Sequence, residues 1–63
     1  MISEYRQNEH LDRMKYLAES CEKGKIGKEE AHILADNILL EILRDCGLEK
    51  IADAFETVPK WYA

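Results

Sequence analysis

The sequence predicts an all-α fold, an antiparallel helical hairpin with a third short helix, assembled as a homo-oligomeric helical bundle. Apolar residues recur at helical spacing in three stretches, no stretch alternates in the manner of a half-buried strand, and the glycines separate the helical stretches. The 63 residues make one domain at most, and a chain this short buries only about 60% of the surface that its unfolded form exposes. We therefore expect it to rely on a partner for stability.

The first helix is predicted over residues 8–22. Asn8 is a suitable N-cap, Ser3 offers an earlier start, and Gly24 follows the predicted end as a C′ residue. Tyr16 lies on the polar side of this helix. The apolar stripe consists of His10, Leu11, Met14, Leu17, Ala18 and Cys21.

The second helix is predicted over residues 28–46. The linker before it is short, so the first two helices should pack as an antiparallel hairpin. The apolar arc of this helix covers about half of its circumference, which is wider than the stripe of the first helix can cover. The arc consists of Ala31, Leu34, Ala35, Ile38, Leu39, Ile42, Leu43 and Cys46.

Two further apolar residues of the second helix, Ile33 and Leu40, lie outside this arc. They are seven residues apart and therefore stack on the same side of the helix, next to Asn37. We expect this separate patch to be an interface with another subunit, because a helix with two apolar sides needs two partners. The C-terminal tail is the alternative cover.

The third helix is predicted over residues 48–58, with an aromatic tail over residues 59–63. Gly47 ends the second helix and Pro59 closes the third. The tail contains Trp61 and Tyr62, which either fold back onto the core or contact a partner. The predicted interface residues are Tyr16, Ile33, Asn37, Leu40, Trp61 and Tyr62.

Composition limits the classes of function. The formal net charge of −4 is spread along the chain with no basic segment, which argues against binding to nucleic acid because the phosphates would be repelled. No apolar run approaches the ~18 residues of a membrane span. Two cysteines without a close pair predict free thiols in a reducing cytoplasm.

No catalytic residue, cofactor site or metal site is predicted. Cys21 is three helical turns from His10, a rise of ~16 Å that excludes a Cys–His nucleophile from this pair. A histidine on an apolar stripe is more often a core or interface residue than a catalytic one. The chain is expected to be non-enzymatic.

Two alternatives remain open. Glu29 and His32 have the E-x-x-H spacing of helical di-metal proteins, so a dimer that binds metal through carboxylate and histidine ligands is one. A DNA-binding regulator of helix-turn-helix type is the other, because Gly47 lies in the turn between two helices. The acidic residues Glu49, Asp53 and Glu56 of the would-be recognition helix weigh against it.

The second half of the chain carries a resemblance. The segment 32–40, with Leu43, Gly47, Ile51, Ala54, Phe55 and the final 60–63 stretch, resembles the C-termini of small bacteriophage and prophage proteins. The resemblance implies a small accessory protein that binds a bacterial host protein and inhibits or redirects it. A protein-binding accessory module is therefore the function that we expect, with a purely structural assembly component as a further alternative.

Overall fold

The computed structural model describes residues 2–59 and contains three helices, α1 (Glu4–Glu22), α2 (Lys28–Asp45) and α3 (Glu49–Glu56). No strand occurs among these residues, which confirms the all-α prediction. α1 and α2 run antiparallel, since Arg6 at the start of α1 pairs with Asp45 at the end of α2.

α1 begins at the earlier of its two predicted starts. The Ser3 hydroxyl accepts a hydrogen bond from the backbone N–H of Arg6 at 3.2 Å and so caps the first turn. Asn8 lies inside the helix and caps nothing. At the other end, Gly24 has a φ of +77°, the left-handed conformation that ends helices at little cost for glycine.

α3 is shorter than predicted. Leu48 has non-helical backbone angles and serves as its N-cap, and Gly47 before it has a φ of +79°. The Thr57 hydroxyl donates to the carbonyl of Ala54 at 2.7 Å, where the helix has ended. The short, sharp connection directs α3 back along α2.

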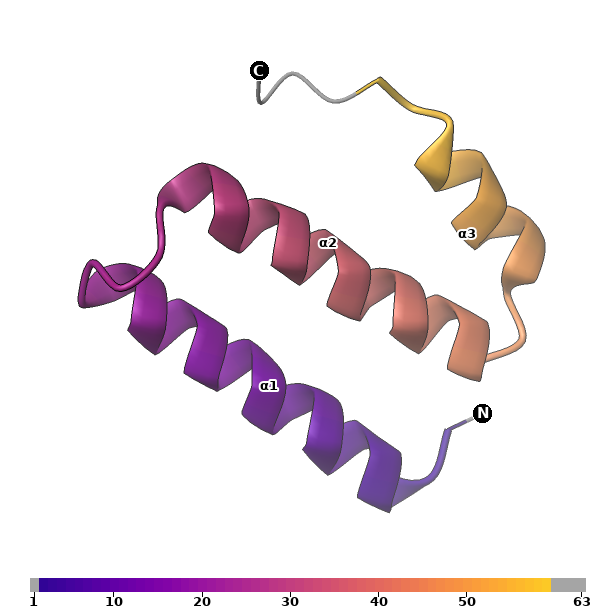
Figure 1. Cartoon of the computed structure of the whole chain (residues 1–63). Coiled ribbons are helices and arrows are strands. Elements are labelled where there is room, and N and C mark those ends of the chain that lie inside the picture. The colour runs from indigo at the N-terminus through magenta and orange to yellow at the C-terminus, as the bar shows by residue number, and fades with distance from the viewer. Residues whose placement is uncertain (1, 60–63) are drawn as a thin grey trace.

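The three helices lie side by side in one layer, with α2 between α1 and α3 (Figure 1). The layer measures 34 by 30 Å but only 7 Å in thickness. The radius of gyration is 12.8 Å, whereas a compact chain of this length is expected to have about 10.6 Å. Globular domains bury their apolar residues between two layers of secondary structure, and this chain supplies one.

The buried apolar side chains are correspondingly few: Leu17, Ile38, Leu40 and Ala52. Ile38 and Leu40 lie about 200° apart around α2, so α2 is buried on two opposite sides. α1 and α3 are the two helices that contact it.

Two predictions for α2 are corrected by this arrangement. Leu40 was expected on an exposed patch, but it is only 7% exposed and cannot serve as a contact for another subunit in this fold. The two apolar sides of α2 were expected to need two packing partners, and α2 does contact two helices. The second of these is α3 of the same chain and not a helix of another subunit. Leu39, expected in the core arc, is 50% exposed, because the helices formed by residues 2–59 lie in one layer and none of them covers it.

Candidate functional site

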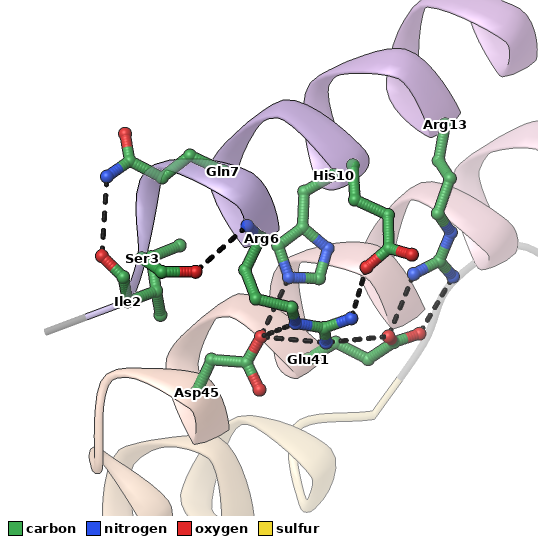
Figure 2. Close-up of polar contacts among 9 residues, drawn as sticks. Ile2, Ser3, Arg6, Gln7, His10, Arg13, Glu41 and Asp45 are labelled. Atoms are coloured by element: carbon green, nitrogen blue, oxygen red, sulfur yellow. Dashed lines mark hydrogen bonds and ion pairs between the residues drawn. The ribbon is translucent and has the colours of Figure 1, made fainter.

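The seam between α1 and α2 carries a polar cluster at the open end of the hairpin (Figure 2). One carboxylate oxygen of Asp45 lies 2.9 Å from His10 Nε2 and 2.8 Å from Arg6 Nη2, and the Arg6 guanidinium also pairs with Glu9. The hydrogen bond from His10, and after it the one from Arg6, lowers the pKa of Asp45. The cluster joins the start of α1 to the end of α2.

His10 is the buried member of that cluster, with 3% of its side chain exposed. An ionised carboxylate only accepts hydrogen bonds, so Nε2 carries the hydrogen that meets Asp45. Nδ1 is buried without a hydrogen-bond partner. Held in this way, His10 connects the two helices of the hairpin, and it also contributes to the lining of a hollow between them.

A second ion pair crosses the same seam one turn further along. The two terminal guanidinium nitrogens of Arg13, Nη1 and Nη2, donate to the two carboxylate oxygens of Glu41, each at 2.8 Å. These hydrogen bonds lower the pKa of Glu41. A two-pronged pair of this kind fixes the register of α1 against α2 as well as their distance.

Arg44 makes the corresponding connection between α2 and α3. Its guanidinium lies 2.7 Å from Glu49, 3.1 Å from Asp53 and 2.6 Å from Glu56. The hydrogen bonds to Glu49 and Asp53 raise the pKa of Arg44. One cation thus holds the acidic side of α3 toward α2.

One side of the layer, which we call the polar face, is the side that carries Tyr16, Asn37 and Arg44. A shallow hollow of about 660 Å³ opens there between α1 and α2, and we call it the polar-face hollow. Apolar side chains form much of its lining and charged groups stand among them, including the Arg13–Glu41 pair. The lining residues are Asp12, Arg13, Tyr16, Leu17, Ser20, Lys25, Ile26, Leu34, Asn37, Ile38 and Glu41.

The opposite side of the layer, which we call the apolar face, has two smaller hollows of about 500 and 170 Å³ between the same two helices. Neither has an aspartate or glutamate among its described lining residues. Leu39 belongs to this face because it is one turn from Ala35 and Ile42, which line the hollows. Leu11 and Met14 contribute from α1.

α3 extends the apolar face. Its acidic side is held by Arg44 on the polar face, and Ile51 and Phe55 lie about 160° and 200° around the helix from Asp53. They therefore point away from the polar face. The large exposed apolar residues placed on the apolar face are Leu11, Leu39, Ile51 and Phe55, and two further exposed apolar residues, Leu48 and Val58, flank α3 at its two ends.

The predicted interface residues divide among several surfaces. Tyr16, 70% exposed, and Asn37 meet at the polar-face hollow, although they come from different helices. Ile33 is half-buried and Leu40 is buried. Trp61 and Tyr62 lie outside the described residues.

Sequence reasoning missed the apolar face as a continuous surface. Its members were assigned to a core because their spacing is that of buried stripes, and spacing alone does not reveal whether a second layer exists. The signal that was available is the sum of the three stripes, which is too much apolar surface for so short a chain to bury.

Other candidate chemistry is sparse in the described part of the chain. Cys21 and Cys46 are free and half-buried. No group of three or more His, Cys, Asp or Glu side chains among residues 2–59 is arranged to hold a metal ion, the surroundings of Glu29 and His32 included. None of the described helices combines the length and the apolar character of a membrane-spanning segment.

Comparison with known proteins adds no further constraint. No family model, curated protein or solved structure matches the chain. The candidate site therefore rests on its own geometry, which consists of a polar face with a lined hollow and an apolar face whose hollows have no aspartate or glutamate in their described lining.

Proposed function

We propose that the chain is a non-enzymatic protein-binding module, and that the polar-face hollow receives an apolar side chain from a partner protein. The observation that supports this function is the meeting of Tyr16, Leu34 and Asn37 at one hollow, each at least partly exposed. Exposed aromatic residues beside polar groups are the usual anchors of protein interfaces.

The charges around the hollow favour a protein segment over a small apolar ligand. Asp12 and Lys25 bring opposite charges to its lining, and the Arg13–Glu41 pair is already neutralised within the chain. A partner segment with one apolar anchor and flanking polar groups matches this lining. A small apolar molecule would leave the charged groups without partners.

The buried state of His10 supports the non-enzymatic part of the proposal. Its Nε2 is engaged by Asp45, only 3% of its side chain is exposed, and it is not among the described residues that line the polar-face hollow. The resemblance noted above suggests a bacterial host protein as the partner class.

The test is capture of a partner from bacterial lysate on the immobilised chain, with two matched variants. Tyr16→Ser removes the aromatic ring that lines the hollow, and Tyr5→Ser removes an equally exposed ring from the same side of α1 without altering the hollow. We expect a specific protein to be retained by the unmodified chain and by Tyr5→Ser, and to be lost with Tyr16→Ser.

The outcomes against the proposal are equally definite. Retention that does not depend on Tyr16 would remove the hollow as the binding site. Salt-sensitive retention on DNA would favour the regulator alternative. Stoichiometric metal in the purified chain, lost on Glu29→Ala, would favour the metal-binding alternative.

A further inference from the structure

We propose that the apolar face is covered by a second copy of this chain, so that two three-helix layers stack face to face as a six-helix, two-layer dimer. The apolar face lies opposite the polar-face hollow, so this pairing goes beyond the proposed function. The polar-face hollow of each copy stays open in such a dimer. The occupant is inferred from area, composition and charge.

The exposed area is the first argument. The chain exposes 4985 Å², whereas a folded monomer of its 7.3 kDa mass is expected to expose about 4,200 Å². The excess of about 800 Å² is the area that each partner buries in a protein–protein interface of standard size. An interface of standard size with one further copy is therefore large enough to account for this excess.

The composition of the face is the second argument. Leu39 from α2, 50% exposed, and Ile51 from α3, 56% exposed, lie on it together with Leu11 from α1. Contiguous apolar surface from three helices is rare on a monomer and typical of the core of a homodimer interface. Stacking it on an identical face also produces the two-layer core that globular folds have.

Charge placement is the third argument. Each copy carries a net charge of −4, so two copies repel each other unless their carboxylates stay apart. The acidic side of α3 and Glu41 lie on the polar face, where arginines pair with them, and neither hollow of the apolar face has a carboxylate in its described lining. Contact through the apolar face keeps Glu41 and the acidic side of α3 on the two outer surfaces of the dimer.

The position of α2 favours a dimer with two-fold symmetry. α2 is the middle helix of the layer (Figure 1), so Leu39, which belongs to α2, lies between the apolar residues of α1 and those of α3. In a two-fold dimer the same patch is used by both copies, and α2 of one copy then packs on α2 of the other. Any change at Leu39 is therefore introduced twice at the centre of the interface.

The test is sedimentation equilibrium of the full chain and of two lysine variants at micromolar concentration. Leu39→Lys places a charge at the centre of the apolar face, and Tyr5→Lys places the same charge on the polar face as a matched control. We expect a dimer for the unmodified chain and for Tyr5→Lys. For Leu39→Lys we expect the dissociation constant to rise by about 100-fold or more, because the buried charge has no partner.

A second measurement keeps the test decisive where Leu39→Lys fails to fold. Cys46 and Cys21 line the two hollows of the apolar face, so a second copy shields both thiols. The rate at which N-ethylmaleimide alkylates the unmodified chain should rise on dilution in proportion to the monomer fraction, and the thermal midpoint should fall.

A monomeric mass at every concentration, with alkylation rates that do not change on dilution, would overturn the pairing. The apolar face would then belong to another occupant, such as residues 60–63 or an unrelated protein. Loss of capture by Tyr16→Ser with an unchanged dimer would separate the two proposals, since each face is probed by its own variant.

Discussion

The two faces of the helix layer differ in the interactions that their side chains make. On the polar face, Arg13 and Arg44 connect neighbouring helices through ion pairs. On the apolar face, leucine, isoleucine and phenylalanine side chains from all three helices are exposed without such connections. Exposed ion pairs contribute only about 0–1 kcal/mol each, so they fix register and spacing, whereas most of the available stabilisation lies in covering the apolar face.

Leu40 and Leu39 give the sharpest contrast, because they are adjacent in the sequence and belong to different surfaces. Leu40→Ala removes a side chain buried within the chain, so we expect the free energy of unfolding to fall by about 2–4 kcal/mol. Leu39→Ala should lower stability through association, and its effect should shrink on dilution. Chemical denaturation at two protein concentrations distinguishes the two losses, and equal concentration dependence would contradict the assignment of Leu40 to the chain's own interior.

This contrast also marks how far the sequence could predict the fold. The helices, the hairpin and the turn at Gly24 follow from local patterns, since periodicity and glycine positions are local properties. Local patterns do not predict which side of α2 is covered by α3, because that side depends on the direction in which the chain leaves Gly47. Ile33 and Leu40 therefore looked like an interface between subunits.

The cross-helix pairs were within reach of the sequence and were missed. An antiparallel hairpin brings together residues at equal distances from its turn, and that rule places His10 opposite Asp45 and Arg13 opposite Glu41. The hollow that Tyr16 and Asn37 share follows from the same register. The exposure of the apolar face could be found only from the three-dimensional arrangement, in which the described helices form a single layer.

Phe55 tests the contribution of α3 to the apolar face. Phe55→Ala should weaken self-association by about 1–3 kcal/mol, roughly 5- to 150-fold in the dissociation constant, because aromatic residues dominate interface energies. The matched change on the polar face, Tyr16→Ala, should leave the dissociation constant unchanged. Analytical ultracentrifugation measures both, and equal effects would show that the faces do not differ as proposed.

Acid should lower the stability of the folded chain by protonating Glu41 and Asp45, whose carboxylates join α1 to α2. The pKa of each is lowered in the folded chain, so the stabilisation is complete above the ordinary values of 4.5 and 3.8 and is lost as the pH falls below them toward the folded-state values. We expect the free energy of unfolding to decline in that range. Glu41→Gln should flatten the decline, and an unchanged pH profile would contradict the role of the Arg13–Glu41 pair.

The smallest effect is expected for Tyr5 on the polar face. Its ring is exposed and lines none of the described hollows, so Tyr5→Ser should change the free energy of unfolding by less than about 0.5 kcal/mol. Thermal denaturation followed by circular dichroism measures this. A larger loss would mean that the polar face, like the apolar face, is covered by protein.

The most direct measurement of the difference between the faces is the mass of the unmodified chain by sedimentation equilibrium at micromolar concentration. Stacking through the apolar face predicts twice the chain mass of 7.3 kDa, with dissociation on Leu39→Lys and none on Tyr5→Lys. A mass of 7.3 kDa at all concentrations would contradict it.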